Sequence, residues 1–220
     1  MHFEILVEGQ SELIALSILM EKIIGPYKRP HTWKIHQHRG IGTLPEQPHL
    51  PPNRNDQTLL HNLPHKLRAY GKAMQGDAMV VVLVDLDDRS DCRHFKQQLV
   101  ELLNSCPTKP TCLFRIAVEE LEAWYFGDSD AIRSAYPHAI SEILSSYIQD
   151  SQCGPWETMA DAIYPEGRMA LCSSGKRSSL VLAQKLKWTK AIAPKMDVER
   201  NTSPSFKCFR DGLRNAIRLS

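Results

Sequence analysis

The sequence has no apolar run near the ~18 residues that a transmembrane helix needs, which excludes a membrane-spanning segment. It also has no basic, cleavable leader, because Met1-His2-Phe3-Glu4 opens directly into an apolar strand pattern. A cytoplasmic protein is therefore expected.

No C-x-x-C pair is present, so we expect reduced thiols rather than a disulfide framework or a zinc site. The six cysteines are Cys92, Cys106, Cys112, Cys153, Cys172 and Cys208.

Several catalytic and cofactor motifs are also missing. No G-x-x-x-x-G-K-[ST] loop occurs, which excludes a P-loop nucleoside triphosphatase. The glycines of residues 40–42 lack the third glycine and the following helix of a dinucleotide site, and residues 173–175 do not form a nucleophile elbow. Two histidine pairs have ligand-like spacing without a third ligand nearby, His36 with His38 and His61 with His65.

The net charge of the chain is close to zero, but the basic and acidic residues are unevenly distributed along it. The chain has 220 residues with 27 Lys and Arg against 25 Asp and Glu, a net charge of +2. Residues 168–220 hold twelve of these basic residues and three of the acids, a net charge of +9, which leaves −7 for residues 1–167. The near-neutral total therefore does not argue against a polyanionic partner.

Hydrophobic patterns predict an alternation of strands and helices. Strands are expected at 3–7, 32–37, 78–84 and 111–118, and helical spacing follows each of them. The run Ala78–Val84 is β-branched without alternation, which is typical of a central parallel strand. We therefore predict an α/β core over residues 1–125, an open, mainly parallel sheet flanked by helices. A proline-rich loop at about 40–56 is expected to be mobile, and residues 126–220 to form a mainly helical, basic extension packed on the core.

Acidic residues follow three of the four predicted strands. Because the carboxyl ends of parallel strands meet at one sheet edge, these acids are expected to converge. Oxygen-only ligands favour Mg²⁺ or Mn²⁺, whereas the alternative is that the acids cap helices. The acids are Glu8 with Glu12, then Asp85, Asp87 and Asp88, then Glu119, Glu120 and Glu122.

Glu8-Gly9 after the first strand and Asp85-Leu86-Asp87 after a later buried strand resemble the TOPRIM domain of topoisomerases, bacterial primases and OLD-family nucleases. The wider pattern resembles a bacterial family of unknown function with a TOPRIM-like core, which adds Glu120-Leu121-Glu122-Ala123-Trp124 and Ser203-Pro204-Ser205-Phe206. The resemblance implies a Rossmann-like TOPRIM fold.

The resemblance also implies roles for individual residues. Glu8 would be a metal ligand or a general acid/base, and Asp85 and Asp87 would bind one or two Mg²⁺ or Mn²⁺ ions. Glu120 or Glu122 would complete a second metal position. The resemblance further implies a catalytic lysine, for which Lys176 is the candidate.

The resulting hypothesis is a metal-dependent nuclease that hydrolyses phosphodiester bonds in DNA or RNA, within a bacterial defence or repair module. The basic segment would bind the nucleic acid or, alternatively, dock on the acidic core. Two other functions stay open: a non-catalytic subunit that docks to a separate ATPase, and a metal-dependent phosphohydrolase of small substrates. The candidate nucleic-acid-binding residues are Lys176, Arg177, Lys207, Arg210 and Arg214.

Overall fold

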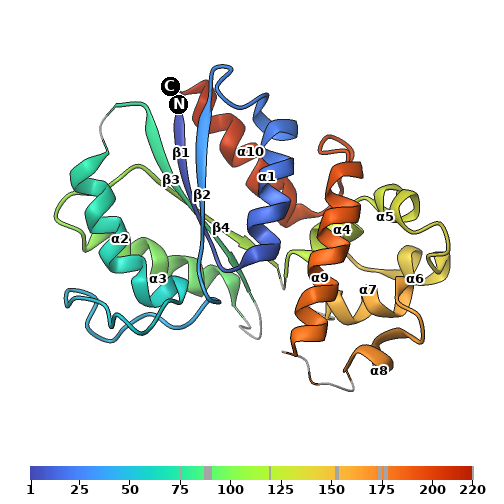
Figure 1. Cartoon of the computed structure of the whole chain (residues 1–220). Helices are drawn as coiled ribbons and strands as arrows, with labels where there is room; N and C mark the ends of the chain where they lie inside the picture. Colours follow the sequence, from blue (N-terminus) through green and yellow to red (C-terminus); the bar gives the residue numbers. More distant parts are fainter. Residues whose placement is uncertain are drawn as a thin grey trace.

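The protein has a four-stranded sheet in which every pairing is parallel, in the order β2-β1-β3-β4 (Figure 1). The computed structural model describes residues 1–74, 76–86, 91–118, 120–151, 154–172, 175 and 178–219. The expected α/β architecture with a parallel sheet flanked by helices is confirmed. The strands are β1 (His2–Val7), β2 (Thr32–Gln37), β3 (Ala78–Asp85) and β4 (Cys112–Ala117).

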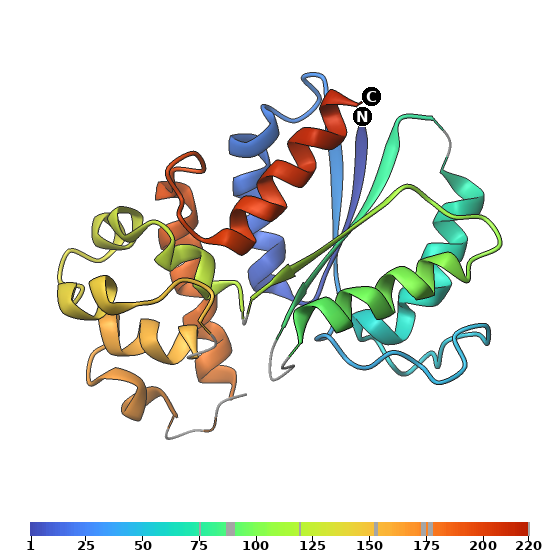
Figure 2. The same ribbon diagram turned by 180° about the vertical axis from the view of Figure 1, so that it is seen from behind.

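Helices cover both faces of this sheet (Figures 1 and 2). Val81 and Leu83 of β3 pack under α1 (Gln10–Ile24) and α10 (Pro204–Arg218). Val80, Val82 and Val84 point to the opposite face, under α2 (Leu59–Ala73) and α3 (Cys92–Asn104). Because β3 is buried on both faces, its sequence is apolar throughout instead of alternating.

The strand order creates a switch point between β1 and β3. The chain leaves β1 through α1 to reach β2 on one side, and it leaves β3 through α3 to reach β4 on the other. In open α/β sheets, ligands bind at the carboxyl ends of strands where the connections diverge in this way. Glu8 and Asp85 lie at this position.

A lobe of helices follows β4, and α9 of this lobe packs along α1 (Figure 1). The described residues after Ala117 contain no strand. The expected boundary at residue 125 falls inside α4, and α10 returns from the lobe to the sheet. The helices of the lobe are α4 (Glu122–Phe126), α5 (Ser129–Ala135), α6 (Ser141–Ser146), α7 (Pro155–Ile163), α8 (Gly167–Cys172), α9 (Ser179–Ile192) and the 3-10 turn η1 (Ala193–Lys195).

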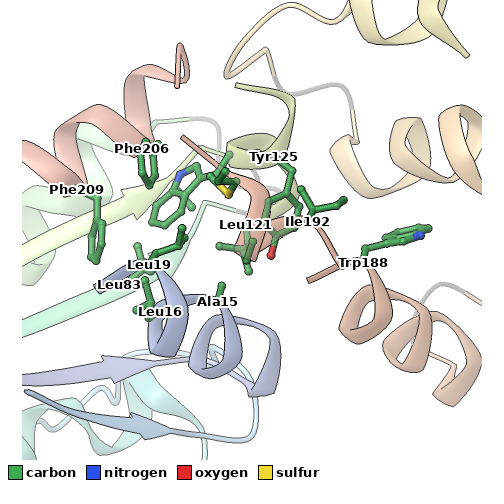
Figure 3. Packing of buried hydrophobic residues seen from close by; sticks show 14 of the residues in the cluster. Ala15, Leu16, Leu19, Leu83, Leu121, Tyr125, Trp188, Ile192, Phe206 and Phe209 are labelled. Carbon is green, nitrogen blue, oxygen red and sulfur yellow. The ribbon is translucent and has the colours of Figure 1, made fainter. Parts of the chain in front are cut away.

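The hydrophobic core is continuous from the sheet into the lobe. Figure 3 shows Leu16 of α1 beside Leu83 of β3, Ala15 of α1 near Leu121 and Tyr125, and Tyr125 of α4 next to Ile192 of α9. The Trp124 indole is fully buried, and its Nε1 donates to Ser205 Oγ at 3.0 Å. The lobe is therefore held against the sheet by both apolar packing and a buried hydrogen bond.

The proline-rich loop is closed at its base by backbone hydrogen bonds. Arg39 N–H donates to the Gln57 carbonyl at 3.0 Å, and Leu59 N–H donates to the Gly40 carbonyl at 2.9 Å. These bonds fix the two ends of the loop beside the carboxyl end of β2, and the mobility of the segment between them stays a prediction. No helix within the described residues is long and apolar enough to cross a membrane.

Candidate active site at the carboxyl ends of the central strands

Glu8 and Asp85 are in direct contact at the switch point. Glu8 Oε1 accepts a hydrogen bond from the backbone N–H of Asp85 at 2.7 Å. Both residues are buried, with exposed fractions of 9% and 8%. The predicted convergence of the acids that follow β1 and β3 is therefore present in the structure.

Glu12 adds a third carboxylate from the first turn of α1. The helix begins directly after Glu8-Gly9, so the fourth residue beyond Glu8 returns to the same edge of the sheet. Its side chain is buried, and burial raises the pKa of Glu12 above its usual value. A side chain at Gly9 would press on Glu12, because a Cβ there would lie 3.2 Å from Glu12 Oε2.

Lys185 of α9 joins the acids that follow β4. Its Nζ lies 3.1 Å from Glu120 Oε2 and 3.2 Å from Glu122 Oε2. Glu122 is fully buried, and within the described residues its Oε1 has no hydrogen-bond partner. Lys185 is therefore the cation that balances this part of the site.

The protonation of these groups follows from burial and mutual repulsion. Burial, with the negative charges of Glu8 and Glu12, raises the pKa of Asp85 well above its usual value. Burial raises the pKa of Glu120 to about 7 and also raises the pKa of Glu122. Burial alone lowers the pKa of Lys185, but the neighbouring carboxylates outweigh it and raise the pKa overall, so the ammonium stays charged.

The site therefore has a strong excess of acidic groups. The ammonium of Lys185, whose side chain is 17% exposed, is the one positive charge that we find among these acids in the described part of the chain. Excess buried negative charge is relieved by proton uptake or by a bound cation. The five acids are Glu8, Glu12, Asp85, Glu120 and Glu122.

The family model for a domain of unknown function (DUF4276) matches residues 7–214. The chain belongs to the DUF4276 family. The match begins at the end of β1 and extends into α10, so it includes all five acids and Lys185. Searches of curated proteins and of solved structures found no match.

Some predicted site residues of this DUF4276 protein lie outside the described residues. They include one of the two predicted metal-binding aspartates and the candidate catalytic lysine. The residues are Asp87, Asp88, Glu119, Lys176 and Arg177.

The arginines of α10 do not reach the acidic site. Arg214 Nε donates to the Ile23 carbonyl at 3.0 Å, and its guanidinium pairs with Glu199. Ile23 is near the end of α1, about 16 Å along the helix from Glu12. Arg210 Nε donates to Asp211 at 2.7 Å. Both arginines therefore bind α10 to neighbouring segments of the chain. Lys207, on the same helix, is partly exposed.

Lys185 is a residue of the candidate site that the sequence analysis did not single out. Its helix carries buried side chains at Val181, Trp188 and Ile192, which recur at helical spacing. Lys185 lies on this buried stripe, four residues after Val181 and three before Trp188. A lysine on an otherwise buried stripe is the signal that would have identified it, because lysine is rarely buried without a partner.

The donor chemistry fits a hard divalent cation. All five acids offer carboxylate oxygens, which Mg²⁺ and Mn²⁺ prefer, and no thiol or imidazole competes among them. In the described residues, however, no group of three or more His, Cys, Asp or Glu side chains is arranged to hold a metal ion. Asp87 lies outside those residues, and a metal site here stays a proposal.

Proposed function

We propose that this DUF4276 protein hydrolyses phosphodiester bonds in nucleic acid with the help of Mg²⁺ or Mn²⁺. The observation that supports this function best is the set of buried acids at the switch point of a parallel sheet, with Glu8 and Asp85 in contact. Glu8-Gly9 and Asp85, which belong to the TOPRIM-like sequence pattern, follow the two strands at this position, and Asp87 lies outside the described residues.

In this proposal, Glu8, Asp85 and Asp87 hold the cation. When bound, the cation supplies charge neutralisation at the phosphodiester oxygens and a lowered pKa for a bound water. Glu12 adds negative charge beside Asp85 and strengthens cation uptake. The folding of Glu8-Gly9 into the start of α1 sets the position of both glutamates.

Lys185 takes the role for which the sequence candidate was Lys176. Its ammonium stays charged because the carboxylates around it outweigh the effect of burial on its pKa. A fixed positive charge in a water-poor site stabilises the negative charge that develops on a phosphoryl group. Lys185 would therefore contact the phosphodiester during hydrolysis.

Binding of the nucleic acid is assigned to the basic segment from residue 168 onward. Lys176, Arg177 and Lys207 stay candidates for phosphate contacts. Arg210 and Arg214 are already paired with carboxylates and carbonyls of the chain, so we expect them to contribute less. Binding through this segment would weaken steeply with salt.

The direct test is incubation of the purified protein with DNA and RNA in Mg²⁺ or Mn²⁺, with EDTA as the metal-free reference. Asp85→Asn should abolish cleavage, because it removes a cation ligand while preserving side-chain shape. Glu21→Gln is the matched control, since Glu21 is an exposed acid on α1 and should leave cleavage unchanged. Equal cleavage by the wild type and Asp85→Asn would contradict the proposed function.

A second candidate is a non-catalytic subunit that docks to a partner such as a separate ATPase. Exposed apolar side chains on neighbouring helices favour it: Met169 on α8 is 79% exposed and Leu182 on α9 is 56% exposed. Exposed apolar groups of this kind are typical of interaction sites when they lie together. Co-purification of a partner that is lost in Leu182→Ser, without cleavage activity, would favour this function over the first.

A further inference from the structure

Lys185 lies beside the acids that the TOPRIM resemblance offered for a second metal ion. Glu120 or Glu122 was the expected ligand of that ion, and Lys185 Nζ lies 3.1 Å and 3.2 Å from one oxygen of each. Glu120 lies just before α4 and Glu122 is its first residue, whereas the lysine reaches them from α9. The three groups therefore meet only through the packing of α9 beside α4.

The ammonium competes with a divalent ion for these carboxylates, because it already holds Oε2 of each. A protonated lysine has three N–H donors and no lone pair, so it repels a metal ion and offers it no ligand. Glu122 is fully buried, and Lys185 is the cation paired with it in the described part of the chain. A metal ion that took the two Oε2 atoms would have to displace Lys185, and one on the remaining oxygens would lie close to the ammonium and be repelled by it.

The backbone of Lys185 is fixed by a chain of buried hydroxyl groups. Tyr125 of α4 donates from its hydroxyl to Thr189 Oγ1 at 3.0 Å, and Thr189 Oγ1 donates to the Lys185 carbonyl at 3.0 Å. Tyr125 and Thr189 are both fully buried. These bonds fix α9 against the helix that carries Glu122, so they hold the base of the Lys185 side chain beside that carboxylate.

We infer that Lys185 is the built-in cation of this position, so that the site takes up a single divalent ion near Glu8 and Asp85 and none at Glu120 and Glu122. The inference rests on the proposed function, because it concerns the same site. It replaces a second metal ion with a residue of the chain. Because Lys185 already balances part of the negative charge, this site needs one bound metal ion where a two-metal site needs two. A lower concentration of free metal is therefore enough to fill it.

Mn²⁺ binding to the full chain tests the inference without any activity measurement. The protein is titrated with Mn²⁺, and free Mn²⁺ is read from its electron paramagnetic resonance spectrum. The wild type should bind a single ion, and Lys185→Met should bind an additional one, because it removes the ammonium and keeps the length of the side chain. Lys185→Arg keeps the charge and should bind as the wild type does. Lys187→Met is the matched control, since Lys187 is an exposed lysine on α9.

A crystal of the wild-type protein soaked in Mn²⁺ provides a test that does not depend on the folding of a variant. Anomalous scattering should show no Mn²⁺ within ligand distance of Glu120 or Glu122, with Lys185 still paired to both. Mn²⁺ on those two carboxylates, or no additional ion in folded Lys185→Met, would overturn the inference. Failure of the wild type to bind any Mn²⁺ would instead contradict the metal assignment of the proposed function, and the comparison with Lys185→Met would still decide the role of Lys185.

Discussion

The carboxylate of Glu8 accepts a hydrogen bond from the backbone N–H of Asp85, with 2.7 Å between Oε1 and the nitrogen. This bond joins the carboxyl ends of β1 and β3, which are neighbours in the sheet. It also holds one acidic side chain beside another where both are buried. The two acids repel each other when both are charged, and a bound cation or a neutral side chain relieves that repulsion.

Asp85→Asn should therefore raise the stability of the metal-free protein. The pKa of Asp85 is raised on folding above its usual 3.8, so the folded state favours the protonated form. The contribution of protonated Asp85 to folding stability is fully present below the pKa that Asp85 has in the unfolded chain. This contribution is lost as the pH rises through the raised pKa of the folded state. The neutral amide escapes this loss, so the gain in stability should be larger at pH 8 than at pH 4.

Thermal unfolding in EDTA at the two pH values measures this effect, with a shift of roughly 2–4 °C per kcal/mol for a chain of this size. Asp91→Asn is the control, because Asp91 is an exposed helix cap whose pKa is lowered by hydrogen bonds from the backbone of His94 and Arg93. Asn caps helices as well as Asp does, so this variant should not gain stability at high pH. A gain of equal size in both variants would contradict the explanation.

Divalent cations should stabilise the wild type and not Asp85→Asn. A ligand that binds only the folded state adds about 2.7 kcal/mol of unfolding free energy at a hundredfold excess over Kd. The same melting experiment, repeated with millimolar Mn²⁺, should therefore raise the Tm of the wild type by several degrees. An equal rise in Asp85→Asn would place the bound ion elsewhere on the protein.

Thr189→Val should destabilise the protein more than Tyr125→Phe does. Loss of the Thr189 hydroxyl leaves the Tyr125 O–H buried without its acceptor, which costs about 1–3 kcal/mol. Tyr125→Phe removes the donor and leaves Thr189 bonded to the Lys185 carbonyl, so about 1 kcal/mol is expected. Urea unfolding of both variants and of the double variant measures the coupling. Additive effects would show that the hydroxyl chain does not act as a unit.

Gly42→Ala should destabilise the protein more than Gly40→Ala. Both glycines have positive φ, +66° and +91°, so each alanine strains the backbone by about 1 kcal/mol or more. Only at residue 42 would the new Cβ collide with a neighbour, since it would lie 2.0 Å from Thr58 Oγ1. Urea unfolding compares the pair, and equal losses would mean that the loop shifts to accommodate the methyl group.

The sequence was sufficient to predict the acids at the ends of β1 and β3. The apolar run of Ala78–Val84 identifies a central strand, and the geometry of parallel sheets brings the residues after such strands to one edge. The contact between Glu8 and Asp85 follows from these two facts. Local pattern and general topology therefore accounted for the centre of the candidate site.

The position of Lys185 was not predictable in the same way. It depends on how α9 packs along α1 and bonds to Tyr125 of α4, and such contacts between distant segments leave no local pattern beyond a stripe of buried side chains. The roles of Arg210 and Arg214 were equally open from the sequence, because a stripe of arginines suits both a phosphate backbone and an acidic neighbour. Their carboxylate and carbonyl partners became evident only from the fold.

The return of α10 to the sheet also has a consequence for how the chain folds during synthesis. The face of the sheet beside α1 is covered by Phe206, Phe209 and Leu213, which follow the end of β4 by 89 to 96 residues. A nascent chain must therefore extend past the whole helical lobe before this apolar face is closed, and contacts of such long sequence separation form slowly. Until α10 emerges from the ribosome, the half-covered sheet is the surface on which a chaperone would act.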